Sequence, residues 1–231
     1  MGTNRTTNVV VASALLALLA FGIVGAALHH GENAASTAAA AAPASAAPSG
    51  RHHIRVPSGF KVVPDPSDGV TIDVPAAWRT PALASGSYAD ALRAFARDNP
   101  EFAAIVQQRL ASTATPIGLF AVEPRSHATV VIQSAPIAGG TKVDAAGLPT
   151  GLRDRYTELG IALVGTDTVQ LPLGKALRAQ LRFLSGGQEL VANQYFVADG
   201  SKLVTVTIQG PAAAADAAPD DRIARTTDRI G

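Results

Sequence analysis

The sequence predicts an α+β domain that follows an apolar N-terminal segment. Three observations support this class. Apolar and polar residues alternate with strand-like period between residues 174 and 209, apolar residues at helical spacing occur in separate blocks, and residues 9–28 include no charged side chain. Because the expected strands come in runs with helices gathered between them, the order differs from a regular βαβ alternation. We expect a central antiparallel sheet of about five to seven strands, flanked by helices.

The composition excludes several classes of function. The formal net charge is +1, with basic residues scattered among acidic ones. Nucleic-acid-binding domains need a clustered basic surface, so we expect no nucleic-acid partner. The chain has no cysteine, which rules out disulfides, thiolate catalysis, zinc coordination through sulfur and lipid attachment at a cysteine.

An apolar run from Val9 to Leu28 (residues 9–28) follows the short polar segment 1–8. A helix of this length rises about 30 Å, which matches the hydrocarbon core of a bilayer. We predict a transmembrane anchor. The alternative is a signal peptide cleaved at the small residues 24–27. In both cases Arg5 favours a cytoplasmic N-terminus, which places the rest of the chain outside the cytoplasm, either as a single-pass membrane protein or as a secreted one.

Residues 29–57 are predicted to form a disordered linker. The stretch 34–50 is nearly all Ala, Ser, Thr and Pro, with no apolar stripe that could dock on a core. Two histidine pairs lie here, His29–His30 and His52–His53. Adjacent histidines on a flexible chain are a poor metal site, so we interpret them as solvated residues and expect no metal or cofactor.

The predicted extracytoplasmic domain, residues 58–231, opens with a hairpin. Residues 60–63 and 70–74 have strand character, and the Pro/Asp/Gly-rich residues 64–69 between them favour a turn. Trp78, the one tryptophan, follows and should close an end of the core.

Three helices and two strands are expected next. The helical stripes are Tyr88, Leu92 and Phe95; Phe102, Ile105, Val106 and Leu110; and Leu152, Tyr156 and Leu159, ending at Gly160. Strands are predicted at 117–122 and 129–133, joined by a turn that contains His127.

The C-terminal part predicts a meander that forms the centre of the sheet. A strand over 161–171 leads into 175–184, 189–197 and 202–209, with a hairpin turn at Asp199–Gly200. The strand 175–184 has two faces, one with Leu177, Ala179, Leu181 and Phe183, and one with Arg178, Gln180 and Arg182. A final helix is predicted over 220–230 with Ile223, Thr227 and Ile230 inward, and we expect Trp78, Phe183 and Phe196 to be buried.

Two motifs carry a family resemblance. Residues 69–78 form a strand that ends in Pro-x-x-Trp, and residues 193–197 pair with 202–207. Together they resemble the PsbP-like fold, in particular the exported actinobacterial proteins of the LpqN type. The resemblance would cover residues 59–230 and implies binding of other proteins rather than catalysis. Its motifs build the core, so no functional residue is carried over, and residues 9–28 would replace the lipidated cysteine that this chain lacks.

Two sets of residues are candidates for binding. Arg178, Gln180 and Arg182 could form a docking row for an acidic partner, or could be the ordinary solvated face of a sheet. If they form a docking row, replacing both arginines by glutamate should leave the fold intact. Trp78 and Tyr195 could line an apolar ligand pocket, or could be core residues.

The sequence therefore favours a non-catalytic binding or scaffold domain of the bacterial cell envelope, with a possible envelope protein as partner. The alternative is a carrier or sensor of a small apolar ligand held between sheet and helices. We do not expect an enzyme: His127 has no Gly-x-Ser-x-Gly serine to activate.

Overall fold

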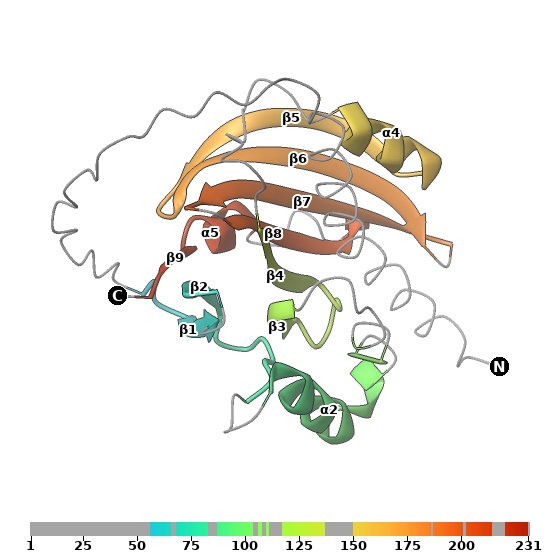
Figure 1. Ribbon diagram of the computed structural model, residues 1–231. Coiled ribbons are helices and arrows are strands. Elements are labelled where there is room, and N and C mark those ends of the chain that lie inside the picture. Colours follow the sequence, from blue (N-terminus) through green and yellow to red (C-terminus); the bar gives the residue numbers. More distant parts are fainter. Residues whose placement is uncertain are drawn as a thin grey trace, which may run out of the picture.

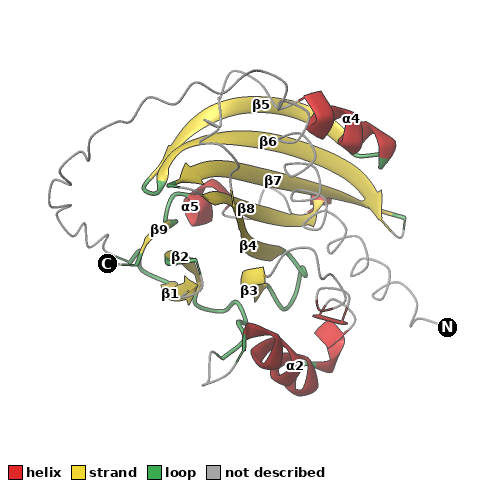
Figure 2. Cartoon of the chain, in the orientation of Figure 1, coloured by secondary structure: helices red, strands yellow, loops and turns green. Residues whose placement is uncertain are grey.

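A computed structural model describes residues 56–65, 68–82, 87–103, 106–107, 110, 117–136, 150–185, 187–200, 202–213 and 220–230. The predicted membrane segment 9–28 lies outside these residues, as do both histidine pairs and nearly all of the linker 29–57. Among the described helices, none has the length and apolarity needed to cross a bilayer. The described chain forms two antiparallel sheets and a few helices (Figures 1 and 2).

The first sheet is small and is separate from the expected central one. Strand β1 (Phe60–Asp65) pairs with β2 (Val70–Pro75) as the predicted hairpin. Gly69 has a φ of +70° in the turn, a conformation that glycine adopts without strain. The short strand β9 (Asp228–Arg229) adds to the free edge of β2. The sequence-based expectation described only the central sheet, and in the described part of the chain these three strands form a second one.

The second sheet has six strands, within the predicted range, in the order β3-β4-β8-β7-β6-β5. Its strands are β3 (Ile117–Val122), β4 (Thr129–Pro136), β5 (Ala162–Leu171), β6 (Gly174–Ser185), β7 (Gln188–Asp199) and β8 (Lys202–Pro211). All pairs are antiparallel, and β5 to β8 are neighbours in chain order, which confirms the meander. Central strand β8 is buried on both faces.

The helices occupy the expected region between strands. Helix α2 (Tyr88–Asp98) starts at Ser87, whose hydroxyl accepts a hydrogen bond from the backbone N–H of Asp90, and a 3₁₀ turn, η1 (Pro100–Phe102), follows it. Helix α4 (Thr150–Glu158) ends before Gly160, which has a φ of +68°. Phe102 and Val106 of the second predicted stripe are buried, while Ile105 lies outside the described residues.

The predicted final helix is shorter than expected. Helix α5 (Asp220–Ala224) covers only its start, and the chain then extends into β9. Ile223 and Thr227 are buried as predicted, but Ile230 is exposed. The physical reason is that β2 offers unpaired backbone groups at its edge: β9 pairs with them, and the Ile230 N–H donates to the Gly69 carbonyl at 2.8 Å.

The large sheet is covered on both faces. On one face, which we call the helical face, α4 packs over β5–β8 through Leu152 and Tyr156, and α2 packs over β3 and β4 through Leu92 and Phe95. On the opposite face lie the small sheet and α5, and α5 contacts both β2 and β8 (Figure 1). The predicted burial of Trp78, Phe183 and Phe196 is confirmed.

Candidate functional site

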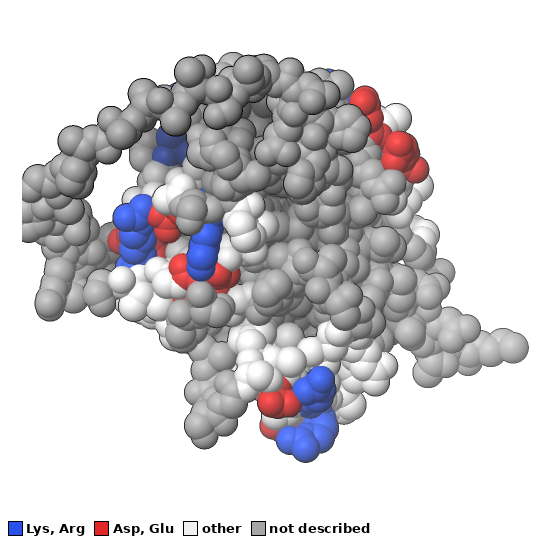
Figure 3. Space-filling model, in the orientation of Figure 1, with Lys and Arg blue, Asp and Glu red and all other residues white. Residues whose placement is uncertain are grey.

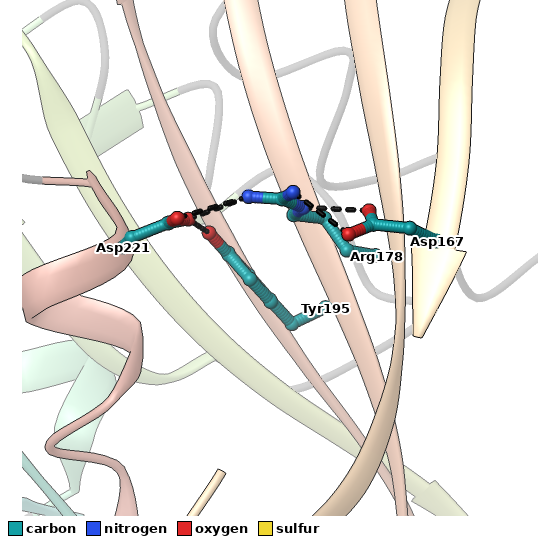
Figure 4. Close-up of polar contacts among 4 residues, drawn as sticks. All are labelled: Asp167, Arg178, Tyr195 and Asp221. Carbon is teal, nitrogen blue, oxygen red and sulfur yellow. Dashed lines mark hydrogen bonds and ion pairs between the residues drawn. The ribbon is translucent and has the colours of Figure 1, made fainter. Parts of the chain in front are cut away.

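Four polar side chains meet where α5 lies against the meander (Figure 4). We call Asp167, Arg178, Tyr195 and Asp221 the Arg178 cluster. Asp167 on β5, Arg178 on β6 and Tyr195 on β7 are register partners across three neighbouring strands. Residues directly opposite one another in antiparallel strands point to the same face, so the sheet itself aligns these three side chains. Helix α5 packs on that face and supplies Asp221.

The guanidinium of Arg178 binds both carboxylates. Its Nε and Nη2 donate to Asp167 Oδ1 and Oδ2 at 2.7 and 2.8 Å. Its Nη1 donates to Asp221 Oδ1 and Oδ2 at 2.8 and 3.0 Å. The Tyr195 hydroxyl also donates to Asp221 Oδ1, at 2.7 Å. The fork of Arg178 and the Asp167 carboxylate thus form two parallel charge-assisted bonds, a geometry that arginine provides and lysine does not.

The cluster lies at the margin of the core. The Arg178 side chain is only 17 % exposed, whereas Asp167 and Asp221 are 43 % and 48 % exposed. Tyr195 is buried in the apolar cluster between the two sheets. The two carboxylates therefore keep part of their hydration, while their negative charges balance the positive charge of the mostly buried Arg178 guanidinium.

The contacts within the cluster shift the pKa values of Arg178, Tyr195 and Asp221. Hydrogen bonds from Arg178 to Asp167, together with the charge of Asp221, raise the pKa of Arg178 despite the opposing effect of burial. Burial and the contact with Asp221 raise the pKa of Tyr195. Burial alone would raise the pKa of Asp221, but hydrogen bonds from Tyr195 and Arg178 more than offset it, and the pKa is lowered. Each of these three shifts moves the pKa further from neutral pH.

The segment that α5 begins, residues 220–230, joins the two sheets, and we call it the C-terminal clasp. The Thr226 hydroxyl accepts from the backbone N–H of Asp73 on β2 at 2.8 Å. The Leu173 N–H donates to the Thr227 carbonyl at 3.1 Å. Arg229 forms an ion pair with Asp199 at the end of β7. The Arg178 cluster, Thr227 and Arg229 therefore anchor the clasp to the large sheet, while Thr226 and β9 hold β2.

The predicted docking row is present on one face of β6, but its members differ in their surroundings. Arg178 belongs to the cluster. Gln180 is half-buried and lies over Gly165 of β5, where an added Cβ would stand 3.0 Å from its Oε1. Arg182 is 56 % exposed and pairs with Glu189 at 3.2 Å. Docking of an acidic partner on this row stays a prediction.

Trp78 and Tyr195, the candidate pocket residues, lie in one buried cluster between the two sheets. The Trp78 carbonyl accepts a hydrogen bond from Lys61 Nζ at 2.5 Å. The binding of an apolar ligand beside these residues also stays a prediction.

Surface charge on the face in view is mixed. Figure 3 shows basic and acidic side chains lying next to one another in small groups. In the part of the chain that the structure describes, no three His, Asp or Glu side chains come together in a way that could hold a metal ion.

Sequence reasoning missed Asp167 and Asp221 as partners of Arg178. Asp167 carried a usable signal, since it interrupts a strand at the position opposite Arg178 once the β5–β6 register is known. Asp221 carried none, because it is 43 residues from Arg178 along the chain.

Neither a protein-family model nor a curated protein matches this sequence. Several solved structures are similar to it at low identity. Cyanobacterial PsbP from Synechocystis has a TM-score of 0.47 and 12 % identity, over 80 % of this chain and 98 % of that one. The Ran-binding protein Mog1p of Saccharomyces cerevisiae has a TM-score of 0.44 and 12 % identity, over 74 % and 95 %. LpqN of Mycobacterium tuberculosis, involved in cell envelope biogenesis, has a TM-score of 0.41 and 13 % identity, over 73 % and 89 %.

The described part of the chain is thus an α+β domain with two antiparallel sheets and a few helices. It has a weak structural resemblance to PsbP and LpqN, the resemblance that the sequence motifs predicted.

Proposed function

We propose that this chain is a non-catalytic binding or scaffold domain of the bacterial cell envelope, anchored in the membrane by residues 9–28 with its folded part outside the cytoplasm. The observation that carries the proposal is the uncharged apolar run 9–28, followed by a low-complexity stretch and then by a folded α+β domain. A run of this length matches a bilayer core, and the low-complexity stretch would let the domain stand clear of the membrane.

The Arg178 cluster supports the non-catalytic part. General acid–base catalysis needs a group whose pKa lies near the working pH. In this cluster the pKa of the carboxylate Asp221 is lowered, and those of Tyr195 and Arg178 are raised. These groups therefore hold their protons, or stay without them, throughout the neutral range. The cluster is suited to fixing the C-terminal clasp rather than to proton transfer.

The docking row supplies the proposed binding surface. Because Asp167 and Asp221 already occupy the guanidinium of Arg178, an acidic partner would depend mainly on Arg182. Exposed ion pairs contribute about 0–1 kcal/mol each, so this contact would set specificity and association rate more than affinity. It should weaken with salt, since charges are screened over about 8 Å at physiological ionic strength.

Cell fractionation tests the location. The full chain with a C-terminal epitope tag should be recovered in the membrane fraction, should require detergent for release, and should lose its tag when protease is added to intact spheroplasts. A cytoplasmic enzyme serves as the control for lysis. A tag that stays protected until the spheroplasts are lysed would contradict the proposal. Release into the medium without detergent would contradict the anchor and favour cleavage of residues 9–28.

Cross-linking in the envelope tests the binding surface. Arg182→Glu should reduce the yield of the main cross-linked partner, and the reduction should be greatest at low salt. Arg93→Glu is the matched control, because Arg93 is also exposed and paired but lies on α2, away from the docking row. Equal yields from the two variants would remove the docking row from the proposal.

A further inference from the structure

A band of polar side chains is buried on the helical face of the large sheet. Six uncharged residues, each at most 3 % exposed, make up this polar band: Thr129, Gln133, Gln194, Thr205, Thr207 and Gln209. Strand alternation in β8 favours an apolar face and a polar face, and the polar one would ordinarily face solvent. In this structure the polar face of β8 is buried instead, beneath the helices of the helical face.

The register shows that the band is continuous. Thr205, Thr207 and Gln209 follow one another along one face of β8. On β4, Gln133 lies opposite Thr205 and Thr129 lies opposite Gln209. On β7, Gln194 lies opposite Thr207. The apolar cluster under α4 borders the band on one side, and the apolar cluster under α2 borders it on the other.

Part of the band is satisfied by hydrogen bonds within the chain. The Tyr156 hydroxyl of α4 donates to Gln194 Oε1, and Gln194 Nε2 donates to Thr207 Oγ1 at 3.2 Å. Within the described part of the chain, three other oxygens of the band have no hydrogen-bond partner: Thr129 Oγ1, Thr205 Oγ1 and Gln209 Oε1. Leaving a buried polar group unsatisfied costs about 1–3 kcal/mol, and the large majority of such groups in proteins are paired.

The chemistry of these atoms defines what would pair with them. Gln209 Oε1 only accepts hydrogen bonds, whereas a threonine hydroxyl can both donate and accept. The band has no charged member, and an ion buried without a counter-charge would be strongly disfavoured. All three oxygens are enclosed, which favours a guest of small size.

We propose that the polar band binds small, uncharged, hydrogen-bonding guests inside the domain. Buried water is the smallest such guest and commonly bridges polar groups of this kind; a small neutral alcohol or amide has the same chemistry. This proposal does not depend on the envelope function. It differs from the predicted carrier site in both its location and its polarity, since Trp78 and Tyr195 belong to the opposite face.

Replacing Thr205 by valine tests the proposal, because the two side chains have nearly the same shape. If a guest bonds to the Thr205 hydroxyl, Thr205→Val loses that bond and lowers the Tm. If the hydroxyl is buried dry and unpaired, the same change removes a cost and raises the Tm. Thr168→Val is the matched control, because Thr168 lies exposed on edge strand β5 and should change the Tm little.

Two measurements identify the guest, each made in detergent on the full-length wild type and on full-length Thr205→Val. Long-lived internal water gives a water-oxygen magnetic relaxation dispersion whose amplitude should fall in Thr205→Val. A small organic guest instead adds mass in native mass spectrometry, and the variant should lose that mass. A raised Tm in Thr205→Val would overturn the proposal. So would a lowered Tm with neither signal, since the partner would then be another part of the chain.

Discussion

Replacing Arg178 by methionine removes the guanidinium from the Arg178 cluster while keeping most of the apolar stem. Two ion pairs are lost together, with Asp167 at 2.7 Å and with Asp221 at 2.8 Å. A fully buried pair that loses one partner costs about 3–5 kcal/mol. Here the two carboxylates are nearly half exposed, so we discount each pair to the upper end of the surface range, about 1 kcal/mol.

We therefore expect Arg178→Met to lower the free energy of unfolding by about 2 kcal/mol, which corresponds to a fall in Tm of roughly 4–8 °C for a domain of this size. The pH dependence has a definite sign. Because the folded-state pKa of Asp221 is lowered, its contribution is present above the ordinary carboxyl pKa of about 3.9 and is lost as the pH falls through the folded value. The difference in free energy of unfolding between the wild type and Arg178→Met should therefore become smaller below about pH 4.

Urea unfolding of both proteins at neutral and acidic pH measures this difference. Arg182→Met is the control, since Arg182 is more exposed and has one ion pair, and it should change stability by less than about 0.5 kcal/mol. Equal effects of the two substitutions at neutral pH would refute the argument. Charge reversal should therefore affect the two arginines differently, although the sequence led us to expect an intact fold after both changes. Arg182→Glu should be tolerated, whereas Arg178→Glu would place a third carboxylate beside Asp167 and Asp221.

Three further substitutions have defined outcomes in the same unfolding assay. Burial raises the pKa of Asp73, so the wild type loses stability as the pH rises above about 4. Asp73→Asn should therefore be more stable than the wild type at pH 7. An Asp73→Asn variant that is less stable than the wild type at pH 7 would contradict this. In Gly118→Ala the new Cβ would stand 1.7 Å from the buried carboxylate oxygen Asp65 Oδ2, and the overpacking should cost about 1–3 kcal/mol or more; an unchanged midpoint would be the contrary result. Burial opposes ionisation of Glu123, but hydrogen bonds from backbone N–H groups of its turn more than offset this and lower its pKa. Glu123→Gln should therefore lower the free energy of unfolding by up to about 1 kcal/mol at pH 7 and by much less at pH 3. A decrease that is the same at both pH values would exclude the charge of Glu123 as its cause.

Elements defined by neighbouring residues could be predicted from the sequence. The first hairpin, the meander and the stop at Gly160 follow from alternation and turn residues, which act over a few positions. The burial of Trp78 and Phe196 follows from the same patterns, because a large apolar side chain in a strand has a strong preference for the core.

Features that depend on distant segments could not be predicted. The helix expected over 220–230 ends early because the edge of β2, about 150 residues away in the chain, captures residues 228–229 as β9. Arg178 has the pattern of a solvated residue until α5 brings Asp221 to it. The polar face of β8 also has the pattern of a solvated face, and only the position of β8 inside the sheet, with helices on either side of the band, makes it buried.

The location of the domain outside the cytoplasm is the central claim, and the absence of cysteine makes one measurement especially direct. A single cysteine at Leu184, which is 76 % exposed at the end of β6, can be labelled in intact spheroplasts with a membrane-impermeant maleimide. A second variant, Thr3→Cys, reports on the other side of the membrane, because Thr3 precedes the apolar run 9–28. We predict that Leu184→Cys is labelled before lysis and Thr3→Cys only after it. Labelling of Leu184→Cys only after lysis would contradict the proposed topology.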